Sequence, residues 1–180
     1  AASRVWLHHA LDALNKDLSD HLVIEKGDAT EIIPDLISRT KAAGIFWNRC
    51  YEPWRIKRDE NIKSFIIDNM DDLDVQSFNG SLLWEPWTIQ NQAGLPYKVF
   101  TPYYRKGCLN ADAPREPLPR PTRLTYGDTD GLGAALNDLK LLPVQERKWD
   151  QALVKHWTIS EDGAQKRLDD FLKIKLTLLC

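Results

Sequence analysis

The sequence predicts an α/β fold in which helices cover a parallel β-sheet. Short apolar runs rich in β-branched residues alternate with longer segments whose apolar residues recur every three or four positions. Their order is helix, strand, helix, strand, helix, strand. The runs LVIE and IFWN also lack a regular alternation of polar and apolar residues, as strands buried on both faces do. These patterns indicate a Rossmann-like, doubly wound parallel sheet with covering helices.

A helix is predicted at the start of the chain, because its apolar residues form a single stripe. The stripe consists of Trp6, Leu7, Ala10, Leu11, Leu14 and Leu18. A short strand is expected at Leu22–Glu25. Thr30 can cap the helix that follows, Glu31 suits the first turn of that helix, and Gly44 suits its C-terminal end.

A second strand is expected at Ile45–Asn48 and a third at Val75–Phe78. Pro53 fits the opening of the helix between them, because the first helical positions need no amide hydrogen. The apolar stripe of that helix consists of Ile56, Ile62, Phe65, Ile66 and Met70. Asn79 and Gly80 mark a turn after the third strand.

Regular structure is expected to stop after Leu83 and to return at Trp149. The stretch between them is rich in proline and contains a glycine-bearing turn region at residues 127–133. A stretch of this length without regular structure is usually a functional loop or a linker. Ser160, followed by two acidic residues, marks the start of the last predicted helix.

The composition is that of a globular domain, with 180 residues of which 43% are hydrophobic. The formal net charge of -2 gives no general attraction to nucleic acid. The sequence has no apolar run of the roughly 18 residues that a membrane span needs. The cysteines, Cys50, Cys108 and Cys180, include no CxxC pair. This pattern indicates reduced thiols in a cytoplasmic protein.

No metal site is predicted. His8 and His9 are adjacent on a helix, so their side chains diverge and cannot chelate one ion. Residues 128–131 begin like a calcium-binding loop, but Leu139 stands where the closing glutamate would be.

Five segments resemble the DNA photolyase/cryptochrome family in the right order along the chain. They are AASRVWLHHALDAL at the start, the WNR-YEP-RD string within residues 44–59, SFNGSLLWEPW at 77–87, PYKVFTPYYRKG at 96–107 and the segment 149–172. The resemblance implies that residues 1–105 form a partial antenna-binding α/β domain, that 106–148 are an interdomain linker and that 149–180 begin a helical FAD domain. The early strands and most of the FAD domain are expected to be missing.

The function that this resemblance implies is that of a fragment of a deoxyribodipyrimidine photolyase. Such an enzyme collects light with an antenna chromophore and passes the energy to FAD, which drives repair of pyrimidine dimers in DNA. Without the FAD domain, the isolated chain is expected to be inactive. The alternatives are a cryptochrome photoreceptor domain, or a stand-alone binding module without catalysis.

The antenna of such proteins is a folate or a deazaflavin, occasionally a flavin, and the resemblance places its contacts at and after the end of the second strand. The residues so placed are Glu52, Cys50 and Asn48, with Arg4 as a basic contact. Each has a plainer interpretation. Glu52 also suits a helix start, where a carboxylate is favoured by the helix dipole. Arg4 also suits a solvated cation or a surface ion pair.

A second candidate contact region mixes basic and aromatic residues. Lys98, Tyr103, Arg105 and Lys106 could meet DNA or the missing FAD domain. The alternative is that the aromatic residues pack this loop onto its own domain. A sheet without its early strands is also expected to expose a strand edge and apolar surface, which favours a homodimer or larger assembly.

Overall fold

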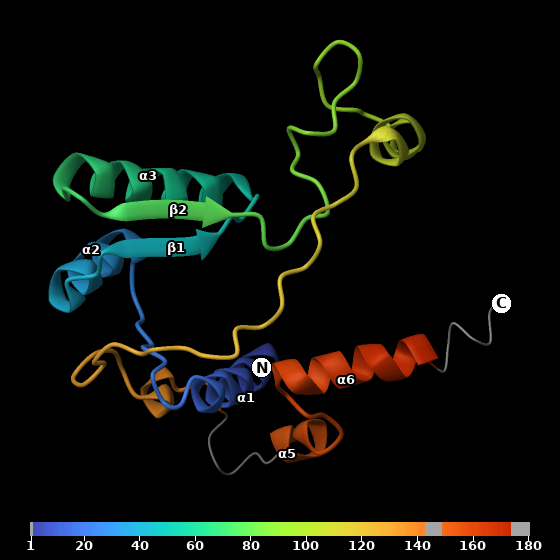
Figure 1. Ribbon diagram of the computed structural model, residues 1–180. Helices are drawn as coiled ribbons and strands as arrows, with labels where there is room; N and C mark the ends of the chain where they lie inside the picture. The colour runs from blue at the N-terminus through green and yellow to red at the C-terminus, as the bar shows by residue number, and fades with distance from the viewer. Residues whose placement is uncertain (1, 143–148, 174–180) are drawn as a thin grey trace. The chain divides into compact units, whose positions relative to one another are not determined.

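The computed structural model describes residues 2–142 and 149–173 (Figure 1). Cys180, the end of the expected linker and the end of the expected FAD-domain segment lie outside these residues. The chain divides into two compact units. The central unit comprises Asp28–Leu124, and the terminal unit comprises Ala1–Gly27 together with Thr125–Cys180.

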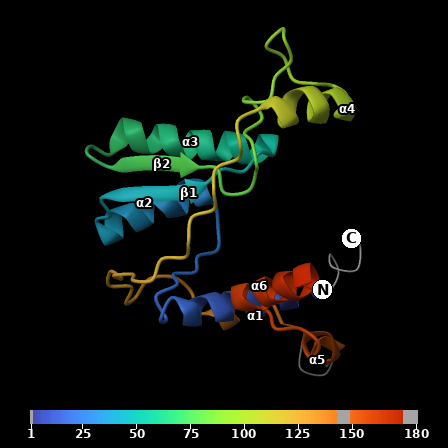
Figure 2. The ribbon, with the colours of Figure 1, turned by 45° about the vertical axis from the view of Figure 1, so that its right-hand side comes forward.

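The central unit contains the parallel sheet. Its elements follow the order α2 (Ala29–Thr40), β1 (Gly44–Asn48), α3 (Pro53–Asn69) and β2 (Asp74–Phe78). The two strands run parallel, with Ile45 beside Val75 in the register, and the arrows of both point the same way in Figure 1 and Figure 2. The predicted α/β class and the strands of IFWN and VQSF are therefore confirmed.

The ends of α2 differ from the prediction. Asp28, not Thr30, caps the helix: its Oδ1 accepts hydrogen bonds from the backbone N of Thr30 at 2.9 Å and from its hydroxyl at 2.7 Å. The helix ends at Lys41, whose φ of 52° is left-handed. Gly44 instead begins β1, where an added Cβ would lie 3.2 Å from the carbonyl oxygen of Asp74. Gly44 is therefore needed for the close approach of β1 to β2 and not for the end of α2.

The core of the central unit lies between the helices and one face of the sheet. Ile37 from α2 packs with Ile62 and Ile66 from α3, and Ile66 is 0% exposed. Other apolar side chains pack against this cluster; they are Ala29, Ile33, Ile45, Met70, Leu73 and Val75. Burial of these side chains is what holds α2 and α3 on the strands.

The opposite face of the sheet carries exposed aromatic residues. Alternation along each strand directs Ile45 and Val75 to the core, so that Phe46 and Phe78 stand on the other side. Phe46 is 57% exposed and Phe78 is 47% exposed, and their ring centroids are 6.4 Å apart. Within the central unit, the described helices that pack on the sheet thus bury only one of its faces.

The chain after β2 is largely irregular, as predicted. The side-chain oxygen of Asn79 accepts hydrogen bonds from the backbone N of Ser81 at 3.2 Å and of Leu82 at 2.9 Å, which forms the expected turn. A short helical stretch follows, with α4 (Phe100–Pro102), a π-helical turn (Tyr103–Gly107) and a 3-10 turn (Cys108–Asn110).

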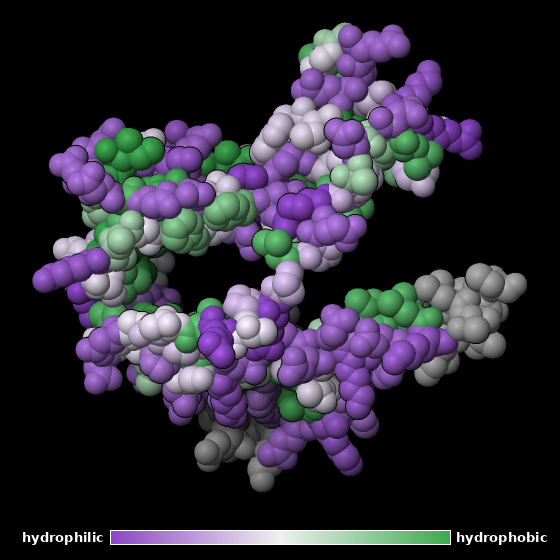
Figure 3. All heavy atoms as spheres, viewed as in Figure 1, coloured by the Kyte–Doolittle hydropathy of each residue, from purple (hydrophilic) through white to green (hydrophobic). Residues whose placement is uncertain are grey.

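The terminal unit contains α1 (Ala2–Asp17), α5 (Trp149–Val154), α6 (Glu161–Phe171) and a 3-10 turn (Leu136–Leu139). Ser160 caps α6, as predicted, because its hydroxyl accepts from the backbone N of Gly163 at 2.9 Å. Green apolar surface gathers along α6 in Figure 3. Apolar side chains of α6 and its C-cap are exposed; they are Leu168, Phe171 and Leu172.

The predicted strand at Leu22–Glu25 is wrong. The segment is irregular and belongs to the terminal unit, whereas both described strands belong to the central unit. The carbonyl oxygen of Ile24 accepts one backbone hydrogen bond, from Ala134 at 2.7 Å, and the backbone N of Leu22 donates to Asn15 Oδ1 at 3.0 Å. A strand needs a ladder of such bonds to a partner strand, and local β propensity does not supply one.

Candidate functional site

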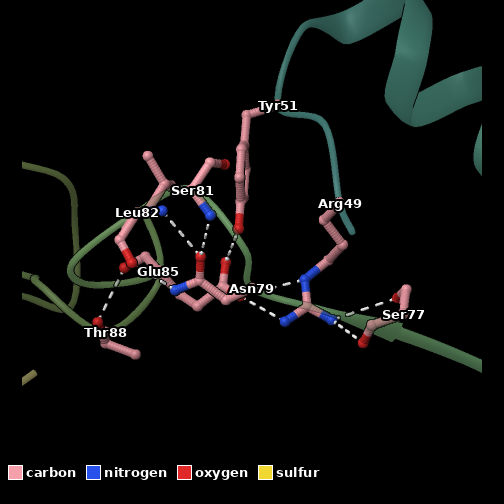
Figure 4. A network of polar contacts seen from close by, with 8 residues as sticks. All are labelled: Arg49, Tyr51, Ser77, Asn79, Ser81, Leu82, Glu85 and Thr88. Carbon is pink, nitrogen blue, oxygen red and sulfur yellow. Dashed lines mark hydrogen bonds and ion pairs between the residues drawn. The ribbon is translucent and has the colours of Figure 1, made fainter. Parts of the chain in front are cut away.

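A network of polar side chains surrounds the carboxyl ends of β1 and β2 (Figure 4). Arg49 follows β1 directly, and its backbone N donates to the carbonyl oxygen of Phe78 at 2.9 Å. Its guanidinium donates to Glu85 from Nε at 3.1 Å and also from Nη2. The same guanidinium donates to the hydroxyl of Ser77 at 3.2 Å and to the Ser77 carbonyl oxygen. Arg49 therefore ties the ends of both strands to the segment that follows β2.

Glu85 joins a second side chain to this network. The phenolic hydroxyl of Tyr51 donates to Oε2 of Glu85 at 2.7 Å, while Arg49 occupies Oε1 (Figure 4). Burial and then the bond to Glu85 raise the pKa of Tyr51 above its ordinary value. The bond to Glu85 likewise raises the pKa of Arg49, so this guanidinium stays charged. The side chain of Glu85 is 11% exposed, so its carboxylate depends on these partners.

The segment that carries Glu85 is held by its own side chains. Asn79 Nδ2 donates to the carbonyl oxygen of Leu82 at 2.8 Å, in addition to the two bonds that its oxygen accepts. The hydroxyl of Thr88 donates to the carbonyl oxygen of Glu85 at 2.8 Å. Trp87 lies under the Arg49 guanidinium, which is 5.8 Å from the ring centroid. These contacts give an irregular segment a defined conformation.

An open cavity of about 550 Å³, here named the polar cavity, lies beside this network. Its lining residues come from the β1–α3 connection, the first turn of α3 and the segment after β2. They are Arg49, Cys50, Tyr51, Glu52, Pro53, Arg55 and Ser81. This cavity adjoins the first turn of α3, so the positive end of the α3 dipole points toward it.

A smaller cavity of about 180 Å³, here named the apolar cavity, shares three lining residues with the polar cavity. Its aromatic lining is Trp47, Tyr51 and Trp87, and Ile56 adds an aliphatic side chain. Arg49, Cys50 and Tyr51 line both cavities.

Two of the predicted antenna residues line the polar cavity. Glu52 is the N-cap residue of α3 but makes no side-chain cap bond; its Oε1 lies 3.7 Å from Nη1 of Arg55. Cys50 Sγ lies 3.4 Å from the same guanidinium nitrogen. The bond to Cys50 and the charge of Glu52 raise the pKa of Arg55. Arg55 thus gives the cavity a cation that is fixed by two of its neighbours.

The other two predicted residues stand elsewhere. Asn48 is the last residue of β1 and lines a separate cavity of about 330 Å³ together with Arg58 and Asp59. Arg4 belongs to the terminal unit, where its guanidinium donates to the carbonyl oxygen of Lys140. The structure therefore brings together Glu52 and Cys50 from the predicted set. The structure also places Tyr51, Arg55 and Glu85 at this site. The sequence pattern alone assigned no binding role to these three residues.

In the predicted basic and aromatic region, the basic side chains and Tyr103 have different surroundings. Lys98, Arg105 and Lys106 are exposed. Tyr103 instead anchors the π-helical turn: a hydrogen bond with the buried Cys108 raises its pKa, and its ring meets Tyr97 at 6.2 Å in an edge-to-face contact. The basic side chains therefore face solvent, and Tyr103 holds the π-helical turn that carries Arg105 and Lys106.

No cluster of three or more metal-ligating side chains occurs in the part of the chain that the structure describes. None of the described helices is long and apolar enough to cross a membrane. Among the described cysteines, Cys50 and Cys108 are free thiols.

Comparison with known proteins agrees with the predicted family. The sequence model of the DNA photolyase family matches residues 1–122. A deoxyribodipyrimidine photo-lyase of Agrobacterium fabrum is 39% identical over 174 residues, which cover 95% of this chain and 36% of that protein. Cryptochrome-2 of Arabidopsis thaliana is 30% identical over 182 residues, which cover 97% of this chain and 29% of that protein. The chain thus spans about a third of the length of these relatives.

A solved structure shows the same fold. The crystal structure of a bacterial class III photolyase from Agrobacterium tumefaciens superposes with a TM-score of 0.84 at 39% identity, over 96% of this chain and 36% of that one. The match extends over almost all of this chain, and the family model covers more than half of it. The chain belongs to the DNA photolyase family.

Proposed function

We propose that this chain is the antenna-binding part of a deoxyribodipyrimidine photolyase, and that the polar cavity holds the antenna chromophore. The observation that carries the proposal is the position of this cavity at the carboxyl ends of parallel strands, beside the first turn of α3. Ligands of open α/β sheets bind at this edge. Relatives that are named photolyases support the activity of the longer protein.

The chemistry of the cavity suits a deazaflavin or a folate. Both are flat conjugated ring systems with a polar tail, and the glutamate tail of a folate carries negative charge. The Tyr51 ring offers a flat wall, while the Arg55 guanidinium and the N-terminus of α3 favour an anion. Glu52 can accept hydrogen bonds from ring N–H groups. The FAD that uses the collected light is expected in the longer photolyase.

Titration of the purified chain with each chromophore tests this proposal. Binding of one chromophore at micromolar concentration, with a shift of its absorption band, is the expected result. Adenosine monophosphate serves as a control for a flat ring with an anionic tail, because it is not an antenna chromophore. A chain that binds neither chromophore more tightly than the control contradicts the proposal.

The second candidate function is that of a cryptochrome domain, which the match to Cryptochrome-2 favours. Repair of cyclobutane or 6-4 dimers in light by the protein expressed from the full reading frame would support the photolyase. Light-dependent binding of a partner without repair would support the cryptochrome. Free thiols at Cys50 and Cys108 agree with a cytoplasmic protein in either case.

The basic region is proposed as a contact surface for DNA. Residues 95–124 contain six basic and two acidic residues, although the chain as a whole carries a net charge of -2. Lys98, Arg105 and Lys106 stand exposed beside Phe100 and Tyr104, whose rings stack at 5.9 Å. Cations beside exposed aromatic rings suit phosphates and bases.

Self-association of the isolated chain is proposed on the exposed face of the sheet. Phe46 and Phe78 leave apolar surface open there, and each described strand has only one hydrogen-bonded neighbour. Surfaces of this kind favour pairing with a second copy. Light scattering at micromolar concentration should give a dimer or larger species, whereas a monodisperse monomer would contradict this expectation.

A further inference from the structure

We propose that Glu85 is a positioning residue for the antenna site, which sets ligand affinity through Arg49 and Tyr51 without touching the ligand itself. The inference rests on the proposed antenna function of the polar cavity. Glu85 does not line that cavity, yet it bonds two of the residues that do.

The geometry of the carboxylate carries the argument. Its two oxygens bond different partners, with Oε1 accepting from Arg49 Nε at 3.1 Å and Oε2 accepting from the Tyr51 hydroxyl at 2.7 Å. One carboxylate therefore fixes the directions of two side chains that lie on either side of Cys50 in the chain. Those three residues line both the apolar and the polar cavity.

The positions of Arg49 and Tyr51 contribute to the shape and charge of the polar cavity. Arg49 is paired with the carboxylate of Glu85, whereas Arg55 is paired more loosely with Glu52 at 3.7 Å, so Arg55 is the cation more open to an anionic tail. The bond to Tyr51 keeps its ring in place as a wall of both cavities. A ligand that meets a wall already in place loses less conformational entropy on binding.

The central unit has other bonds at the ends of its strands besides those to Glu85. Arg49 keeps its backbone bond to Phe78 and its side-chain bonds to Ser77 when Glu85 is changed. The core cluster of Ile37, Ile62 and Ile66 does not include Glu85. Substitution of Glu85 should therefore weaken ligand binding far more than it weakens folding.

The test compares Glu85→Gln and Tyr51→Phe with the wild-type chain, using the chromophore that the wild type binds. Glutamine keeps the size of the side chain, but it is uncharged and has an NH2 group in place of one of the two oxygens that Arg49 and Tyr51 bond, so one partner loses its acceptor. We expect the Kd to rise about tenfold in each variant, as loss of one hydrogen bond to a charged group does. Asp35→Asn is the matched control, because it removes the carboxylate of an ion pair with Arg39 on α2.

A second measurement reports on Glu85 without any ligand. The ionisation of Tyr51 is followed by ultraviolet absorption, as the difference between the wild type and Tyr51→Phe. In Glu85→Gln, this phenol should ionise at lower pH, because the bond to the carboxylate raises its pKa. An unchanged melting temperature together with both shifts supports a positioning role.

The outcomes separate the two proposals. A Kd for Glu85→Gln within twofold of the wild type overturns the positioning role, and so does a Tyr51 titration identical to the wild type. A wild-type chain that binds neither chromophore overturns the antenna function and the effect on affinity, while the Tyr51 titration still decides whether Glu85 holds the phenol.

Discussion

Tyr51 and Glu85 are 34 residues apart in the chain, and the phenol of one donates a 2.7 Å hydrogen bond to the carboxylate of the other. The bond joins the β1–α3 connection to the segment after β2 (Figure 4). It matters because Tyr51 lines both cavities, so the segment after β2 takes part in shaping a site whose lining is mostly on the β1–α3 side. The shape of the site thus depends on a bond between distant parts of the chain.

One prediction concerns Ile66 in the hydrophobic core. Because Ile66 is 0% exposed and packs with Ile37 and Ile62, Ile66→Ala should destabilise the central unit by about 2–5 kcal/mol. Ile67→Ala is the matched control: the side chain of Ile67 is 61% exposed, and its loss should cost about 0.5 kcal/mol or less. Urea unfolding followed by circular dichroism measures both. Equal destabilisation by the two variants would contradict the described core.

The helix-cap prediction concerns Asp28 and pH. Hydrogen bonds from Thr30 lower the pKa of Asp28 below its ordinary value of 3.8. The folded chain therefore favours the charged carboxylate. Its stabilising effect is complete above the pKa of the unfolded chain and is lost as the pH falls through the lower pKa of the folded chain. Asp28→Ala should lower the melting temperature at pH 7 and have a smaller effect below pH of about 3.

Asp28→Asn is the control for that experiment. Asparagine is also a good N-cap residue but has no charge to lose. Its melting temperature should stay close to that of the wild type at pH 7. If Asp28→Ala melts like the wild type at pH 7, the cap assigned to Asp28 is wrong.

The electrostatic prediction concerns Arg55. If the polar cavity takes an anionic tail, then Arg55→Met should raise the Kd for the antenna chromophore about tenfold or more. The effect should decrease as salt concentration rises, since salt screens a partly exposed charge. Arg39→Met removes a basic side chain from the α2 surface and should leave the Kd unchanged. Equal affinities of all three proteins would exclude Arg55 as a ligand contact.

The nucleic-acid prediction concerns the basic region. Replacement of Lys98, Arg105 and Lys106 by alanine should weaken binding to a single-stranded oligonucleotide and flatten its dependence on salt. The logarithmic slope should fall by about 0.7 for each phosphate that the variant no longer neutralises. A control that replaces Lys26, Lys155 and Lys166, which are exposed in the terminal unit, should change binding less. Fluorescence anisotropy measures both, and equal weakening by the two variants would show that only total charge matters.

The sequence predicted the central unit well because its signals are local. Pro53 at the first position of α3, the apolar run of β1 and the buried Ile62 and Ile66 all depend on neighbours within a few positions. Leu22–Glu25 was mistaken for a strand because pairing requires a partner that propensity does not reveal. Thr30 was taken for the cap because both Asp28 and Thr30 are good capping residues, and only geometry decides between them.

The candidate site could be predicted only in part. Glu52 and Cys50 belong to a string typical of the family, and they do line the polar cavity. Arg49 and Tyr51 belong to the same string, but their function depends on Glu85, which comes from the irregular segment after β2. Nothing in local pattern or spacing indicates which carboxylate will meet which cation at that distance in the chain.

Amide chemical shifts in NMR, followed as the isotopically labelled chain is titrated with the antenna chromophore, show whether the polar cavity is the antenna site. Saturable shifts should be concentrated at Arg49, Cys50, Tyr51, Glu52, Arg55 and Ser81, which line the polar cavity and carry an amide hydrogen. Shifts absent from these residues at saturating chromophore, or confined to the terminal unit, would contradict this site.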